Sequence, residues 1–289
     1  MSGAARFEYA TARDPALNYC LWAYTPPAPA PDKFRSINLL LQSFDHAGAD
    51  AAAYQMVEAI REAIGDFRTV FGVKLNADRL AWEFYFYDYA RREREVSIGR
   101  VLKAIQPFAA CDVPIDESLP YFMFSLDLSP KAGGPTRTID VVHMYIGNPG
   151  SAVSSGVAYA VRADATRLEN FYFFFDARSQ ADEAADKIRS SAFFDATRLP
   201  IEDVLAPELR DCRTICVANK QTHDCVYFSG VDVDQLLHFL KRLSYPAAIV
   251  DFVAANRGQL DHLLFDVGFD YRMENGALLV LKSGYYGVF

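Results

Sequence analysis

The chain ends in the stretch 277-ALLVLKSGYYGVF-289, which has the composition of a β-strand. The run 263-LLFDVGFDY-271 precedes it and 274-ENG-276 lies between them as a turn, so we expect an antiparallel hairpin. Because successive side chains of a strand point to opposite faces, Lys282 and Tyr286 share one face. A lysine in the middle of a half-buried strand raises the question of which environment surrounds that face.

Strand pairs of this kind recur along the chain. The other four predicted pairs are 70–74 with 79–89, 121–128 with 137–147, 157–164 with 169–177, and 213–220 with 224–230. The predicted helices are 51–64, 93–105, 179–189 and a segment that begins at the capping-box sequence 232-DVDQ-235. The order helix, strand pair, helix thus repeats about five times, and the Gly-rich turn 131-KAGGP-135 connects the second pair.

About ten antiparallel strands in one chain must satisfy the hydrogen bonds of their edges, and closing into a barrel removes the edges. Helices that are apolar on one side must then cover an apolar exterior. We therefore expect an α+β fold, a closed antiparallel barrel of about ten strands with helices outside and a ligand cavity in the lumen. The alternative is an open antiparallel sheet, or two sheets, packed on helices.

We expect residues 1–289 to form a single domain. Within it, residues 1–33 read as an N-terminal arm that contains the Pro-rich run 24-YTPPAPAPD-32, and residues 51–289 supply the barrel.

Alternation within the strands separates two kinds of face. The residues expected to face the helices are Trp82, Phe84, Phe122, Phe124 and Phe173, and those expected to line the lumen are Tyr85, Tyr172 and Tyr286. A solvent-facing side would carry Lys, Glu and Thr, so a wall of tyrosines indicates an enclosed cavity. On this interpretation Lys282 lies mid-strand because its face is a polar lumen. The alternative is a lysine at the exposed end of an edge strand.

Composition excludes several classes of protein. The net charge of −8 over 289 residues argues against a nucleic-acid binder, which needs clustered Lys and Arg. No run of about 20 apolar residues and no leader is present, so we expect neither a membrane span nor a signal peptide. The five cysteines are scattered and lack zinc-site spacing, which favours free thiols and no metal-ligating set. We expect a cytoplasmic monomer.

The strand pairs and the tyrosine faces resemble the soluble aromatic prenyltransferases of the ABBA, or PT-barrel, family. That family has repeated α-β-β-α units around a ten-stranded barrel, and the resemblance covers about residues 51–289. Three short motifs carry it: 82-WEF-84, 170-NFYF-173 and 282-KSGYY-286. The resemblance implies that Glu83 contacts Mg²⁺ or the aromatic acceptor.

The same resemblance implies roles for the other two motifs. Asn170 and Lys282 would bind diphosphate, and Tyr286 would line the acceptor pocket. The chain departs from the family where it has His143 and Tyr145 in place of a lysine, and Tyr227 near the place of an arginine. The diphosphate site then needs cations from elsewhere, such as Arg162, Lys74 or His143.

The resemblance implies a definite set of site residues and substrates. The expected catalytic residues are Glu83 and Tyr286, and the expected substrate-binding residues are Lys74, Tyr85, His143, Tyr145, Arg162, Asn170, Tyr172, Tyr227 and Lys282. The partners would be a prenyl diphosphate and an aromatic acceptor. No protein metal ligand is assigned, no cofactor is certain, and Mg²⁺ stays open.

The chemistry of prenyl transfer explains these residue types. An allylic diphosphate ionises to a carbocation and diphosphate; Lys and Arg stabilise the leaving charge, and tyrosine rings shield the cation. A carboxylate such as Glu83 can hold the acceptor or accept its proton. Two alternatives remain: a non-catalytic barrel for a hydrophobic aromatic or lipid-like ligand, and a cyclase or isomerase that uses Glu83 and His143. The number of converging cations separates the first alternative from the enzyme.

Overall fold

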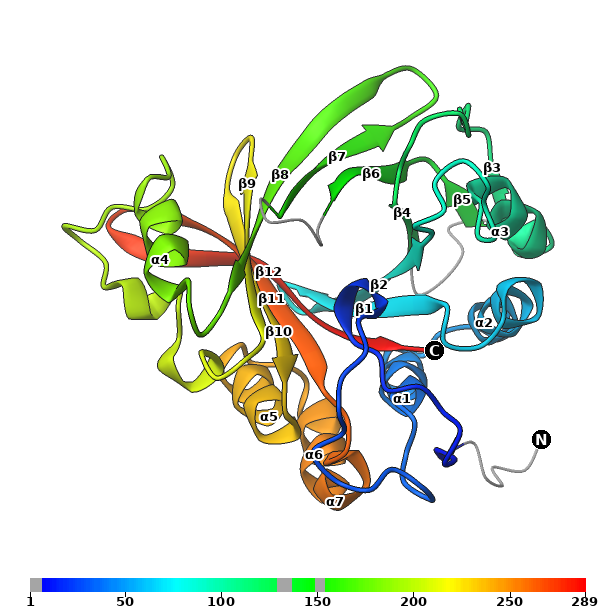
Figure 1. The fold of residues 1–289 in the computed structure, drawn as a ribbon, viewed down its shortest axis with the longest axis horizontal. Coiled ribbons are helices and arrows are strands. Elements are labelled where there is room, and N and C mark those ends of the chain that lie inside the picture. Colours follow the sequence, from blue (N-terminus) through cyan, green and yellow to red (C-terminus); the bar gives the residue numbers. More distant parts are fainter. Residues whose placement is uncertain (1–6, 129–136, 149–153) are drawn as a thin grey trace.

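The computed structural model describes residues 7–128, 137–148 and 154–289. These residues form a closed barrel of ten antiparallel strands in the order β1-β12-β11-β10-β9-β8-β7-β6-β4-β2 (Figure 1). The strands are β1 (Thr69–Asn76), β2 (Arg79–Tyr87), β4 (Met123–Leu128), β6 (Val142–Asn148), β7 (Ser155–Val161), β8 (Thr166–Asp176), β9 (Thr214–Lys220), β10 (Asp224–Val231), β11 (Phe265–Glu274) and β12 (Ala277–Val288). The predicted barrel is therefore confirmed, and each of the five predicted strand pairs contributes two antiparallel neighbours to it.

Strand β1 closes the barrel, since it pairs with β2 on one side and with β12 on the other. Val70 lies opposite Tyr85 of β2 and opposite Val288 of β12. The first and last strands of the sequence are therefore neighbours, and neither keeps a free edge.

Helices lie around the outside of the barrel (Figure 1). They are α1 (Ile37–Ala47), α2 (Ala51–Ile64), α3 (Ile98–Ile105), α4 (Ala181–Arg189), α5 (Val233–Arg242), α6 (Ala247–Ala255) and α7 (Arg257–Leu260). A short parallel pair, β3 (Ala109–Cys111) with β5 (Arg137–Ile139), lies outside the barrel. No helix in the described part of the chain is long and apolar enough to cross a membrane.

The helices pack through the apolar residues that their periodicity singles out. In α2 the buried side chains include Met56, Val57 and Ile60, which recur on one face of the helix. In α5 the predicted capping box is present, because the Asp232 carboxylate accepts hydrogen bonds from the backbone N–H groups of Asp234 and Gln235. The apolar face of α2 and the capping box of α5 are thus present as the sequence predicts.

The main core lies between the helices and the outer face of the barrel. Trp82 is fully buried there, its indole N–H donates to Ser43 Oγ at 2.8 Å, and its ring packs edge-on against Phe44 at 4.6 Å. Phe84 and Phe124 are buried in the same cluster, as predicted. Apolar burial of this kind stabilises the fold by about 25 cal/mol per Å².

The prediction for Phe122 is wrong. Phe122 lies one residue before β4, packs on the Tyr89 ring at 6.0 Å, and belongs to the cluster inside the barrel. Its neighbour Tyr121 is buried in the outer core beneath the Arg94 guanidinium. Alternation holds only within a strand, and because β4 begins at Met123 it does not extend back to these two residues.

Two other expectations differ from the structure. The predicted strand 137–147 is two strands, because Asp140 and Val141 interrupt it and β5 leaves the barrel. No helix of the described residues separates β6 from β7, so the regular alternation of helices and hairpins is broken there. The predicted turn 131–135 and the first six residues of the predicted arm lie outside the described residues.

Candidate active site

The lumen holds a cavity of about 460 Å³ that opens towards the hairpin turns of the barrel. All the residues predicted from the sequence line it: Lys74, Glu83, Tyr85, His143, Tyr145, Arg162, Asn170, Tyr172, Tyr227, Lys282 and Tyr286. The structure thus brings together residues from β1, β2, β6, β8, β10 and β12, and from the turn after β7. Their roles stay predictions.

The body of the cavity is a wall of tyrosine rings. The Tyr286 ring lies 5.8 Å from that of Tyr85 and 6.1 Å from that of Tyr227, and Tyr145 lies 5.9 Å from Tyr172. Burial raises the pKa of each of these phenols well above its ordinary value, so they stay neutral at physiological pH. Neutral aromatic faces attract a cation without reacting with it as water would.

Glycines in the neighbouring strands make room for two of these rings. A Cβ at Gly268 would lie 2.3 Å from the Tyr227 ring, and a Cβ at Gly72 would lie 2.7 Å from the Tyr286 ring. A Cβ at Gly284 would lie 2.8 Å from the Tyr286 hydroxyl. Glycine in 282-KSGYY-286 therefore avoids a steric clash, because the Tyr286 side chain folds back over it.

A lysine and a glutamate form an ion pair on the wall of the lumen. Lys74 contacts Glu83, and the Ser125 hydroxyl donates a hydrogen bond to the same carboxylate. Burial, reinforced by the charge of Lys282, lowers the pKa of Lys74 to about 7. The charge on Lys74 therefore depends on which anions lie beside it.

A second cluster surrounds Asp270 at the mouth of the lumen. Its Oδ2 accepts hydrogen bonds from Lys220 Nζ at 2.9 Å and from His223 Nε2 at 3.1 Å, and Lys282 Nζ lies 3.5 Å away. Burial raises the pKa of Asp270, but Lys220 and the other donors outweigh it and hold that pKa well below its ordinary value. Asp270 thus holds two lysines and a histidine together at one point.

His143 joins a third cluster. Its Nδ1 lies 2.8 Å from Glu169 Oε2 and its Nε2 lies 3.3 Å from Asp127 Oδ2. Burial alone would lower the pKa of His143, but the two carboxylates raise it above its ordinary value. The two carboxylates therefore favour the protonated form of the imidazole.

Solved structures match this arrangement of strands, although no protein-family model and no curated protein matches the sequence. One is the crystal structure of PriB in a binary complex with product diphosphate, with a TM-score of 0.52 and 13% identity. Another is prenyltransferase PriB in a ternary complex with L-tryptophan and dimethylallyl thiolodiphosphate, with a TM-score of 0.50 and 12% identity. Each match covers 88% of this chain and 94% of the other. The chain has the PT-barrel fold.

This PT barrel contains cations that the sequence did not reveal. Lys220 and Arg167 line the cavity beside the predicted Lys74, Arg162 and Lys282. Lys220 is the last residue of β9, and Arg167 is the second residue of β8, where the alternation is interrupted by a bulge. Both lie next to hairpin turns, where a charged residue is ordinarily solvated, so nothing in the pattern singles them out.

Several lumen carboxylates were also missed. Asp127, Glu169 and Asp270 line the PT barrel beside Glu83. A signal for Asp270 exists in the sequence, because Asp270 and Lys282 face each other across the predicted hairpin. Register is needed to see it, since strand boundaries alone do not say which residues are opposite each other.

Each of the four described lumen carboxylates is already paired with a cationic side chain. Glu83 is paired with Lys74, Asp127 and Glu169 with His143, and Asp270 with Lys220. Mg²⁺ is bound through oxygens that are free to coordinate it, and these already accept from cationic side chains. Within the described residues, no group of three or more His, Cys, Asp and Glu side chains is placed to hold a metal ion.

Proposed function

We propose that this protein transfers a prenyl group from an allylic diphosphate to an aromatic acceptor inside the barrel. The observation that carries the proposal is a group of lysines at the mouth of a lumen whose body is walled with tyrosine. The first feature suits an anionic leaving group and the second suits a carbocation. PriB, which shares the fold, has been crystallised with diphosphate and with an aromatic amino acid.

The diphosphate of the donor would bind at the mouth. Lys220 and Lys282 are already gathered there around Asp270, and both contribute to the electrostatic environment of Lys74. Cations held by a fixed carboxylate need little reorganisation when charge develops on the leaving group. These lysines therefore favour cleavage of the bond between carbon and diphosphate oxygen.

The prenyl carbon would then point down towards Tyr85, Tyr227 and Tyr286. Their rings stabilise the allylic cation and exclude water, and the acceptor ring attacks that cation at carbon. Glu83 lies among them and offers its carboxylate to a phenol O–H or an indole N–H. Its contacts with Lys74 and with the Ser125 hydroxyl hold that carboxylate in place.

The cation count weighs against a barrel for a neutral ligand. Such a ligand needs no converging Lys or Arg, whereas five line this cavity. The cyclase or isomerase alternative would use Glu83 and His143 without a diphosphate donor. Analysis of the reaction products distinguishes a prenyltransferase from a cyclase or isomerase.

The deciding experiment incubates the full chain with dimethylallyl diphosphate and a panel of phenols and indoles. We expect diphosphate release that depends on one class of acceptor, together with a product heavier by one prenyl group. EDTA should leave the rate nearly unchanged, because lysines would neutralise the diphosphate in place of a metal ion. No acceptor-dependent release from any allylic diphosphate would refute the proposal.

Lys282→Ala tests the binding of the donor. Removal of one charged hydrogen-bond donor to a diphosphate costs about 1.5–3 kcal/mol, so the donor dissociation constant should rise about 10- to 100-fold. Calorimetry with a non-reacting donor analogue measures this, and the melting temperature should change little. Lys103→Ala, at an exposed position of α3, is the matched control. Unaltered donor affinity in Lys282→Ala would rule out its role.

A further inference from the structure

The N-terminal arm enters the barrel at the end opposite the hairpin turns. Its tip is the single 3₁₀ turn Tyr19–Leu21, and Cys20 within it is buried in the lumen cluster. The Tyr19 ring lines the central cavity and meets the Tyr87 ring edge-on at 6.2 Å. An aromatic side chain from outside the barrel repeats therefore forms part of the substrate cavity.

Hydrogen bonds to two strands and to the turn after β2 hold this tip in place. The Tyr19 backbone N–H donates to Asp266 Oδ2 of β11 at 2.7 Å, and the Asn18 amide donates to Ser229 Oγ of β10 at 3.3 Å. From two residues beyond the end of β2, the Tyr89 hydroxyl donates to the Cys20 carbonyl at 3.0 Å. The tip is thus fixed to the wall of the barrel on several sides.

The backbone of the tip is strained in a way that such contacts must offset. Cys20 has φ 59° and Leu21 has φ 53°, both in the left-handed region. Such a conformation persists only where the surroundings determine it. Tyr19 directly precedes these two residues, and its side chain lines the lumen.

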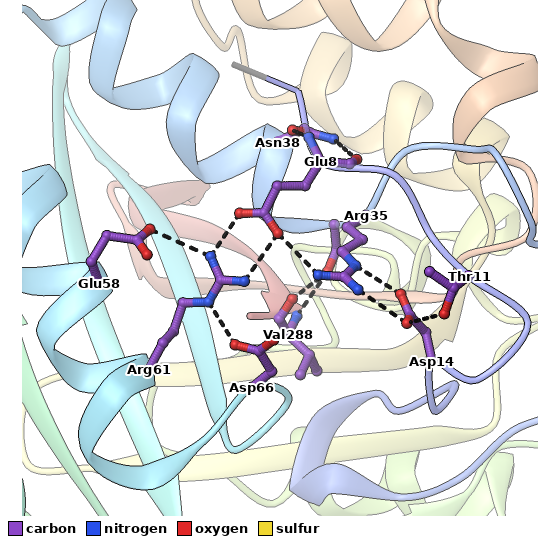
Figure 2. A network of polar contacts seen from close by, with 10 residues as sticks. Glu8, Thr11, Asp14, Arg35, Asn38, Glu58, Arg61, Asp66 and Val288 are labelled. Atoms are coloured by element: carbon purple, nitrogen blue, oxygen red, sulfur yellow. Dashed lines mark hydrogen bonds and ion pairs between the residues drawn. The ribbon is translucent and has the colours of Figure 1, made fainter. Parts of the chain in front are cut away.

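The base of the arm is clamped by charges (Figure 2). Glu8 accepts two hydrogen bonds from Arg61 of α2, at 2.7 and 3.0 Å, and a third from Arg35 at 3.1 Å. Arg35 also binds Asp14 through two hydrogen bonds, at 2.7 and 3.0 Å. The loop that carries Tyr19 therefore leaves from a fixed base and returns to it.

The position of Tyr19 defines how deep the lumen is below its mouth. Its backbone is bound to Asp266, which faces Tyr286, whereas the mouth lies at the level where Asp270 faces Lys282. Four residues of strand separate the two levels, about 13 Å along the strand. The donor's prenyl chain must share the space above the Tyr19 ring with the acceptor, in a cavity of about 460 Å³ in all.

We propose that Tyr19 is the floor of the lumen and limits the donor to a short prenyl chain, the dimethylallyl group. The inference rests on the proposed function. It assigns a specificity-determining role to the arm, whose ring blocks the space that the second half of a geranyl chain needs. A smaller residue at position 19 extends the cavity towards the buried Cys20 and Tyr87.

The test compares two non-reacting analogues, dimethylallyl and geranyl thiolodiphosphate, by calorimetry with the full chain. We expect the wild-type protein to bind the dimethylallyl analogue more tightly. Tyr19→Ala should raise the affinity for the geranyl analogue relative to the dimethylallyl analogue about tenfold. Tyr19→Leu should shift the ratio in the same direction by less, and it decides the question should Tyr19→Ala fail to fold.

Tyr9→Ala is the control, because Tyr9 lies on the same arm but is 50% exposed. It should leave the ratio at the wild-type value. Binding of both analogues with an unchanged ratio in both Tyr19 variants would overturn the inference and leave the proposed function intact. A wild-type preference for the geranyl analogue would overturn it as well. If neither analogue binds the wild-type protein, the proposed function fails and the inference fails with it.

Discussion

The Glu83 carboxylate forms an ion pair with the neighbouring Lys74. Its side chain is 5% exposed and that of Lys74 is 10% exposed, so both charges are removed from most of their water. A buried ion pair is weak evidence for stability as a whole, but removal of one partner leaves an uncompensated charge. The two residues must therefore be considered as one unit in any substitution.

At pH 6, below the Lys74 pKa of about 7, Glu83→Gln should lower the free energy of unfolding by about 3 kcal/mol, because the Lys74 ammonium loses its counter-ion. Acceptor-dependent transfer should fall strongly, since no carboxylate remains to hold the acceptor. A diphosphate analogue should raise the melting temperature more in the variant than in the wild-type protein, because it supplies the missing negative charge. Urea denaturation and thermal scans with and without the analogue measure this. Equal stability of variant and wild type would contradict the ion pair.

At the scale of elements, His143 connects three strands. It lies on β6 and contacts Asp127 of β4 and Glu169 of β8, with β7 between β6 and β8. Lys74 lies near Asp127 and Arg162 near Glu169, so cations also face the two carboxylates. The imidazole thus couples the charges of one half of the lumen.

The raised pKa of His143 gives a pH dependence with a definite sign. Its stabilising contribution is fully present below about pH 6.5, the ordinary histidine value, and is lost as the pH rises through the raised pKa. The stability difference between the wild-type protein and His143→Gln should therefore be larger at pH 5.5 than at pH 9. Urea midpoints at the two pH values test this. A difference that grows towards pH 9 would show that the imidazole is neutral in the folded protein.

The arm is a second element whose attachment can be tested. Glu8→Gln removes the charge that two arginines share in the clamp of Figure 2. These side chains are 14–25% exposed, so we expect a loss of about 1–2 kcal/mol in the free energy of unfolding. Glu95→Gln, in the exposed pair with Arg68, is the control and should change little. A loss no larger than the control's would mean that the clamp contributes nothing.

At the scale of the whole molecule, closure of the barrel depends on the last strand. β12 pairs with β1 through Val288, and Phe289 is buried 5.2 Å from the Phe84 ring. Without that end, Val70, Phe71 and Gly72 of β1 would lose their partners, and half of the seam between β1 and β12 would become an exposed edge. The fold should therefore be sensitive to the loss of very few residues.

Truncation after Tyr285 removes four residues, and we expect the protein to lose its cooperative unfolding transition. Near-UV circular dichroism and urea denaturation measure this, because both report fixed packing of aromatic side chains. Val280→Ala, a substitution at a partly exposed position of the same strand, should keep the transition. A cooperative transition in the truncated chain would show that the barrel is stable while open.

The barrel could be predicted from the five strand pairs and their edges, and the tyrosine wall of its lumen from alternation, whereas the site residues Glu83, Asn170 and Lys282 came from the resemblance to a known family. Within a strand, Tyr85 and Tyr172 must lie on the face opposite to Trp82 and Phe173, whatever the other strands do. The prediction failed at Phe122, one residue outside a strand. Boundaries of elements depend on where the chain leaves its neighbours, which local patterns do not contain.

The rest of the site could not be predicted because it arises from long-range contacts. Lys220 becomes a lumen cation only through Asp270, fifty residues away, and Tyr19 becomes part of the cavity only through Asp266. Neither residue stands out locally. The composition of the Pro-rich arm predicts a linker. Only in the closed barrel does the arm form the floor of the lumen.

The position of the arm also affects how the protein folds during synthesis on the ribosome. The tip is synthesised well before its partners, since Ser229 and Asp266 follow 211 and 247 residues later, and Ser36 binds Val288 at a separation of 252. Such contacts cannot form until those later residues have emerged, and long separations slow folding. The arm is therefore synthesised before the strands that hold it but reaches its native position only after they have formed, and until then the barrel lacks this part of its wall.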